Sequence, residues 1–109
     1  MSARLRRNLA LLKMLVTASP QQRKAILCAA SDDLVAAISE IALNTLKGNV
    51  PISESQFRVL KKKQQLIKKL SSKRGSIYSK KKLVKQSGGF IGALLGIAIP
   101  LITSLLSGK

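Results

Sequence analysis

Lysine side chains dominate one stretch of this sequence and could bind phosphate. Residues 57–85 contain 12 basic residues and no acidic residue. Lysine carries a point charge that suits phosphate oxygens, whereas base-edge recognition relies on the arginine fork. The excess of Lys over Arg therefore predicts non-specific binding of nucleic acid through its phosphates. The candidate nucleic-acid-binding residues are Arg58, Lys61, Lys62, Lys63, Lys68, Lys69, Lys73, Arg74, Lys80, Lys81, Lys82 and Lys85.

Side chains suited to catalysis are scarce. The chain has no His, four carboxylates and a single cysteine, Cys28, in 109 residues. A catalytic cysteine needs a neighbouring base, and a structural zinc ion needs several Cys or His ligands. We therefore expect no enzyme activity, no catalytic residue, no metal site and no cofactor. Cys28 lies among small apolar residues, which predicts a buried structural thiol.

The overall charge calls for an anionic partner. A net charge of +16 on 11.7 kDa far exceeds the magnitude of roughly 2–8 that suits a small soluble domain. Such self-repulsion destabilises a compact chain unless a polyanion neutralises it. The basic stretch is therefore expected to be partly disordered before binding. The chain has three aromatic residues, and Phe57 and Tyr78 lie in this stretch. Base stacking is therefore expected to contribute little.

Apolar periodicity predicts an all-α protein. Residues 1–48 are expected to form a short helical hairpin or small bundle with a small core. Ser19-Pro20 and Ser31 are helix-start signals, and Gly48 is a helix-stop signal. The expected buried stripes follow i, i+3 and i+4 spacing. They comprise Leu5, Leu9, Leu12 and Val16 in the first helix, and Leu34, Ile38, Ile41 and Ala42 in the third.

Residues 49–86 are expected to form the basic nucleic-acid-binding arm. Ser53 and Gln56 have the spacing of a capping box, which predicts one amphipathic helix from this point to about residue 70. Its thin apolar seam would consist of Phe57, Leu60, Gln64, Ile67 and Leu70. A shorter basic segment follows over residues 77–85.

Residues 87–109 are expected to form a glycine-containing apolar helix, which Pro100 would kink or end. Residues 90–107 carry no charge over 18 residues, the lower edge of the about 17–25 that span a membrane. Gly88, Gly92 and Gly96 recur every four residues and form a candidate membrane or helix-packing face. A buried core helix and a self-association surface are the alternatives to a membrane segment.

Two function classes follow from these three segments. The first is a structural protein that binds and condenses nucleic acid non-specifically through the Lys-rich 58–85 segment. The alternative is a small membrane protein or membrane-active peptide anchored by residues 90–107. In that case the polybasic segment would bind an anionic membrane, at about 1 kcal/mol per basic residue near the surface. The positive-inside rule would then keep the N-terminal side cytoplasmic.

Residues 41–106 resemble a known class of viral proteins. The segment LNTLKGNVPIS, the Lys-rich stretch and VKQSGGFIGALLGIAIPLI are similar to a small basic protein of Polinton/Maverick elements and adintoviruses. The tail is also similar to the precursor of the adenovirus core protein mu, or X. This resemblance implies a virion core protein that condenses packaged double-stranded DNA in the virion or host nucleus.

The same resemblance implies processing by a viral-type cysteine protease. Adenovirus-type proteases cut after Gly-Gly or Gly-X in a short motif, and the matching residues are Gly88, Gly89 and Phe90. Gln86 departs from the Met, Leu or Ile that the motif prefers at its fourth position before the cut.

Overall fold

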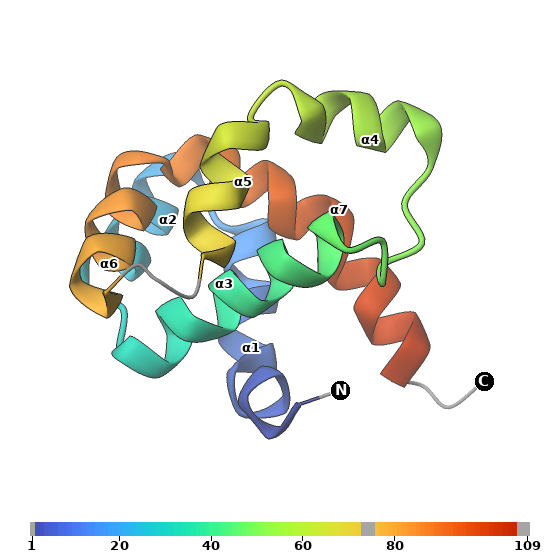
Figure 1. The fold of residues 1–109 in the computed structure, drawn as a ribbon. Helices are drawn as coiled ribbons and strands as arrows, with labels where there is room; N and C mark the ends of the chain where they lie inside the picture. The colour runs from blue at the N-terminus through green and yellow to red at the C-terminus, as the bar shows by residue number, and fades with distance from the viewer. Residues whose placement is uncertain (1, 73–75, 107–109) are drawn as a thin grey trace.

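The computed structural model describes residues 2–72 and 76–106, and this part of the chain is helical outside its turns (Figure 1). The predicted all-α class is confirmed. The helices, in chain order, are α1 (Ala3–Thr17), α2 (Pro20–Cys28), α3 (Asp32–Leu46), α4 (Glu54–Lys61), α5 (Gln64–Ser71), α6 (Ile77–Gln86) and α7 (Gly88–Leu106).

Serine side chains begin five of these helices. Each accepts a hydrogen bond from the backbone amide three residues further on, which satisfies a donor that the first helical turn leaves unpaired. These N-cap residues are Ser2, Ser19, Ser31, Ser53 and Ser76. Ser19 and Ser53 also form complete capping boxes, with Gln22 and Gln56. The predicted caps at residues 19, 31 and 53 are therefore confirmed.

Gly48 ends α3 as the sequence predicts. Its φ of 78° lies in the left-handed region that glycine adopts without strain. The Asn49 amide donates to the Asn44 carbonyl at 2.9 Å, and the Gly48 amide donates to the Thr45 carbonyl at 3.2 Å. This pair of bonds is a Schellman motif, which turns the chain away from α3 and toward α4.

The helices α3 and α7 form the centre of the molecule. α3 packs against α1, α5, α6 and α7, and α7 also packs against α1, α2 and α6. The predicted stripe of α3 is buried at all four positions. The apolar face of α7 faces it with Ile91, Leu94, Leu95 and Ala98, all fully buried. The uncharged tail is thus a core helix, one of the alternatives that its sequence left open.

One hydrophobic core contains buried residues from all three segments predicted from the sequence, 1–48, 49–86 and 87–109. Leu60, Ile67, Leu70 and Val84 of the basic arm lie in the same buried cluster as residues of α1, α3 and α7. The core of residues 1–48 is therefore continuous with that of the remaining described helices. The Cα radius of gyration, 12.7 Å, equals the roughly 13 Å expected of a single domain of this length.

The basic arm forms two helices where the sequence predicts one. α4 ends at Lys61 and α5 begins at Gln64, because Lys63 leaves helical geometry with φ −117° and ψ 31°. Only Leu60 of α4 is buried, and Figure 1 shows α4 set apart from the other helices. Phe57 was expected in the apolar seam but is 51% exposed. The break lets α5 pack on α3 while α4 remains at the periphery.

Three further expectations are corrected by the packing. Pro100 does not end α7, which continues to Leu106 with Pro100 on its exposed side. The buried face of α1 is formed by Leu5, Asn8, Leu12 and Leu15, so Leu9 and Val16 lie beside it and are half-buried. Cys28 is exposed, because the last turn of α2 buries its neighbour Leu27 instead.

None of the helices in the described part of the chain combines the length and the apolar composition of a membrane span on its own. The pair formed by α6 and residues 88–104 meets both criteria jointly, but its two axes differ in direction by 95°.

Candidate nucleic-acid interface

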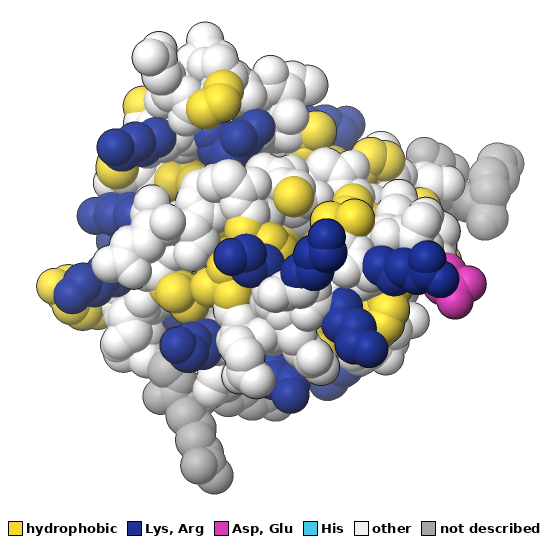
Figure 2. Space-filling model, turned by 90° about the horizontal axis from the view of Figure 1, so that it is seen from above, with side chains coloured by type: hydrophobic (Ala, Val, Ile, Leu, Met, Phe, Trp, Pro, Cys, Tyr) yellow, Lys and Arg dark blue, Asp and Glu magenta, His cyan; other side chains and the backbone are white. Residues whose placement is uncertain are grey.

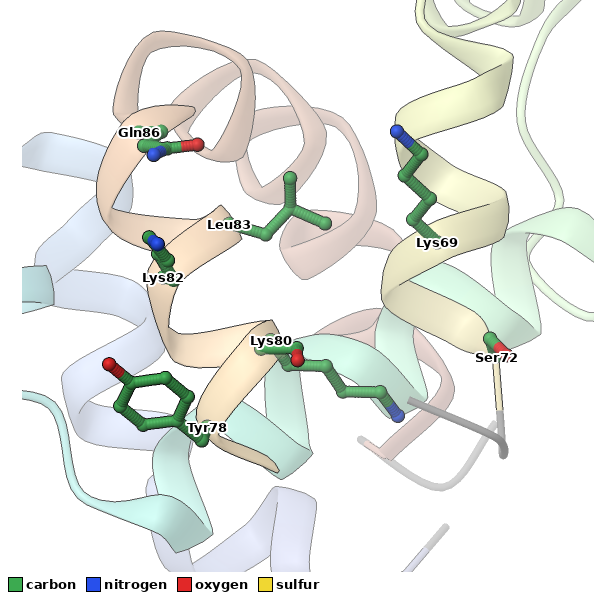
Figure 3. A pocket seen from close by; sticks show the side chains of 8 residues that line it. Lys69, Ser72, Tyr78, Lys80, Lys82, Leu83 and Gln86 are labelled. Atoms are coloured by element: carbon green, nitrogen blue, oxygen red, sulfur yellow. The ribbon is translucent and has the colours of Figure 1, made fainter. Parts of the chain in front are cut away.

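A cavity opens between α5 and α6, two helices that pack against each other. Its volume is about 600 Å³. Lys69 lines it from α5, and Lys80 extends from α6 toward α5, whereas Lys82 lines it from the side of α6 that also bears Tyr78 and Gln86 (Figure 3). Leu83 extends from α6 toward α5 and forms an apolar floor between these charges. The remaining lining residues are Ser72, Tyr78, Ser79 and Gln86.

A second cavity continues the first along α5 toward the α4–α5 break. It has a volume of about 430 Å³ and shares Lys69 and Leu83 with the first cavity. Its other lining residues are Lys61, Lys62, Lys63, Gln64, Gln65 and Leu66. Because two residues line both cavities, we treat them as one feature, the basic groove.

The basic groove is electrostatically one-sided. Six lysines line it, and none of the residues that line its two cavities is acidic. They are Lys61, Lys62, Lys63, Lys69, Lys80 and Lys82. Figure 2 views the molecule from above and shows basic side chains spread over the visible face, with an acidic group only at its edge. Lysines gathered without a carboxylate repel one another, so an anion in the groove would lower the free energy of this arrangement.

The other candidate lysines and arginines fall into three groups. Two of them form ion pairs. Arg58 Nη2 lies 3.8 Å from Glu54 Oε1 on α4, and Lys81 Nζ lies 2.7 Å from Asp32 Oδ1 on α3. Lys68 and Lys85 are exposed on α5 and α6 but do not line the groove. Lys73 and Arg74 lie outside the described residues. The packing thus separates six groove lysines from four cations beyond it.

The scarcity of aromatic residues predicts little base stacking, yet the ring of Tyr78 stands at one end of the groove. It is 73% exposed. Figure 3 shows Tyr78, Lys82 and Gln86 following one another along the same side of α6. Their i, i+4 and i+8 spacing is visible in the sequence and places them on one helix face. That spacing could have identified the stripe, but not the position of α5 opposite it.

The glycines of the predicted packing face have different surroundings. An added Cβ at Gly92 would lie 2.5 Å from the guanidinium carbon of Arg23, whereas at Gly96 it would meet nothing within 4 Å. Arg23 donates from Nε to the Leu15 carbonyl and from Nη2 to the Ala18 carbonyl, both at 3.1 Å. Gly92 therefore makes room for a side chain that satisfies the C-terminal carbonyls of α1.

The candidate cleavage residues lie at the bend between α6 and α7. Gly88 and Gly89 form the start of α7, and the Ile91 amide donates to the Ser87 carbonyl at 2.9 Å. Gly89 is exposed and Phe90 is half-buried. Proteases cut most readily at exposed loop tips, so cleavage after Gly89 would require the first turn of α7 to unwind.

Comparisons of this chain with protein-family models, curated proteins and solved structures found no match.

Proposed function

We propose that this protein binds nucleic acid non-specifically and that the basic groove is its principal contact with the phosphates. The observation that carries the proposal is the gathering of six lysines around two cavities that share Lys69 and Leu83 and whose lining contains no carboxylate. These lysines come from α4, α5, α6 and the α4–α5 break. A ligand with regularly spaced negative charges suits such an elongated array, and nucleic acid is the abundant polymer of that kind.

The mechanism is counterion release. Each lysine that neutralises a phosphate frees a condensed cation, so affinity falls steeply as salt rises. Lysine ammonium groups contact phosphates without reading base edges, which makes binding independent of sequence. A bound polyanion also relieves the self-repulsion of a chain with charge +16. Condensation of packaged DNA in a virion or nucleus, and protease processing near Gly89, are the extensions that the viral resemblance suggests.

Membrane anchoring has weaker support as the alternative. Insertion would require α7 to expose Ile91, Leu94 and Leu95, which are fully buried against other helices. Insertion would move these side chains from one apolar environment, the core, to another, the lipid, and would leave the core of the domain open. The polybasic surface alone would bind anionic headgroups, so vesicles belong among the competitor ligands in the test.

The test compares two double variants with the same net charge. Lys69→Gln with Lys82→Gln removes two groove lysines, whereas Lys68→Gln with Lys85→Gln removes one exposed lysine from each of the same helices outside the groove. Binding to a short duplex is measured by fluorescence anisotropy over a range of salt concentrations. If about 8–12 phosphates are neutralised, the unmodified protein has a log–log salt slope of roughly −7 to −11. The groove variant should reduce that slope by about 2 and lower the affinity further than its partner does.

Three outcomes decide the proposal. A greater loss in the groove variant than in the control variant supports the groove as the contact. Equal losses would show that net charge alone governs binding and would overturn the groove assignment. Binding that barely responds to salt, or that occurs with anionic vesicles and not with nucleic acid, would overturn the nucleic-acid function itself.

A further inference from the structure

We propose that the basic groove receives single-stranded nucleic acid, with one base stacked on the ring of Tyr78. This inference rests on the proposed function and adds the class of nucleic acid and the contact made by a base. The ring of Tyr78 can stack on an unpaired base, a contact that phosphates alone do not offer.

The exposure of Tyr78 requires an explanation. Its side chain could bury a large apolar area, yet it is 73% exposed beside a cavity lined by lysines. In Figure 3 the ring stands at the end of the groove, one helical turn from Lys82, whereas Lys80 extends from the same helix toward α5. An aromatic face next to ammonium groups is the combination that single-strand-binding proteins use, with bases on the ring and phosphates on the cations.

The stacking contact favours one strand over two. A duplex can offer its phosphates to the groove lysines. Its bases, however, are paired and stacked inside, and their extrusion costs a few kcal/mol per base. A single strand offers phosphates and an unpaired base face together.

The groove also supplies a suitable surface for a base beyond the ring. Leu83 forms an apolar floor, and Gln86 places an amide on the same side of α6 as Tyr78 and Lys82. Apolar contact and stacking do not depend on base identity, so this site would accept any base. The proposal therefore stays within non-specific recognition.

Tyr78 provides its own spectroscopic probe, because the chain contains one tyrosine and no tryptophan. Tyrosine fluorescence of the full-length protein is followed during titration with three probes of equal length: an oligothymidylate, an abasic strand and a blunt-ended duplex. Stacking should quench the emission with the oligothymidylate and leave it nearly unchanged with the abasic strand. At the same salt concentration, the oligothymidylate should bind more tightly than the abasic strand and more tightly than the duplex.

Two substitutions separate the contribution of the ring to binding from that of the neighbouring lysines. Tyr78→Leu retains an apolar side chain but removes the ring, and Tyr78→Phe retains the ring. Tyr78→Leu should weaken oligothymidylate binding on the order of tenfold, the size expected of one stacked base. It should leave the affinities for the abasic strand and the duplex unchanged, and Tyr78→Phe should bind the oligothymidylate as the unmodified protein does.

The inference fails if Tyr78→Leu binds the oligothymidylate as tightly as the unmodified protein. It also fails if saturating oligothymidylate leaves the tyrosine emission unchanged, or if the duplex binds at least as tightly as the single strand. In each of these cases, lysine-dependent binding to the duplex or the abasic strand would leave the proposed function standing. If the unmodified protein bound none of the three probes, both proposals would be wrong.

Discussion

Asp33 joins the first turn of α3 to α1 through several donors. It accepts hydrogen bonds from Arg7 Nη2 at 3.0 Å and from Asn8 Nδ2 at 2.8 Å, and Arg4 lies 3.7 Å away. The Arg7 hydrogen bond, supported by that of Asn8, holds the pKa of the Asp33 carboxyl below its usual value. Its position in the first turn of a helix also favours the ionised carboxylate.

This lowered pKa makes the stability of the domain depend on pH in a defined window. Because the pKa of Asp33 is lower in the folded state than in the unfolded state, its stabilising contribution is complete above the unfolded carboxyl pKa of about 4. The contribution is lost as the pH falls through the folded-state pKa. Asp33→Asn should lower stability at pH 7 and weaken the acid-induced loss, as measured by urea unfolding between pH 7 and pH 2.

Glu54→Gln is the matched control for Asp33→Asn. Glu54 is 86% exposed and lies 3.8 Å from Arg58 at the edge of the molecule, where an ion pair contributes little. This variant should keep the unfolding profile of the unmodified protein at every pH. Identical profiles for both variants would contradict the role assigned to Asp33.

At the scale of elements, Arg23 connects three helices. It belongs to α2, donates to the Leu15 and Ala18 carbonyls at the end of α1, and lies against Gly92 of α7. A helix C-terminus carries partial negative charge, so a guanidinium is well placed there. Within the glycine repeat of α7, Gly92 thus allows a contact inside the domain, with Arg23.

Two alanine substitutions on α7 should have opposite effects. Gly96→Ala should raise stability by about 0.5–1 kcal/mol, because alanine favours a helix and the new methyl group has space. Gly92→Ala should lower stability by about 1–3 kcal/mol, because its methyl group displaces Arg23 from the carbonyls of α1. Thermal and urea unfolding of both variants provide the measurement.

An Arg23→Ala background tests the cause. With the guanidinium removed, Gly92→Ala should no longer destabilise the domain, so the two substitutions should be strongly non-additive. Equal effects of Gly92→Ala in both backgrounds would mean that the methyl group disturbs something other than Arg23.

At the scale of the whole molecule, the apolar tail is an integral part of the core. The buried side chains of α7 face α1, α2 and α3, whereas Gly89, Ala93, Gly96, Pro100 and Ser104 form its exposed side. Removal of α7 would therefore expose the centre of the domain. A truncation that ends before this helix is a poor test of nucleic-acid binding, since it would impair folding as well.

A charged residue on either side of α7 separates a core helix from a membrane segment. Leu95→Lys places an unpaired charge in the core and should cost more than about 3 kcal/mol, a large share of the about 5–15 kcal/mol that stabilise a domain. Ala93→Lys lies on the exposed side and should change stability by less than about 0.5 kcal/mol. Circular dichroism during thermal unfolding measures both effects. If α7 acted in a bilayer, both variants would instead reduce vesicle binding to a similar extent.

The sequence by itself determined where α2, α3 and α4 begin and where α3 ends. The serine caps, the two capping boxes and the stop at Gly48 depend on residues within one helical turn of each other, so local chemistry decides them. The same holds for the stripe of α3 and for the concentration of lysine between residues 57 and 85. Those features are sufficient to predict an all-α protein with an anionic partner.

The tertiary structure decided which residues act together. Lys69 and Lys82 share one groove, Lys81 pairs with Asp32, and Lys68 and Lys85 point elsewhere, although all five lysines lie in similar local sequence. These differences depend on the angle and distance between helices that are remote in sequence, which core packing sets and local pattern does not. For the same reason, one apolar tail could be read as a membrane segment until the burial of Leu95 and its neighbours placed it in the core.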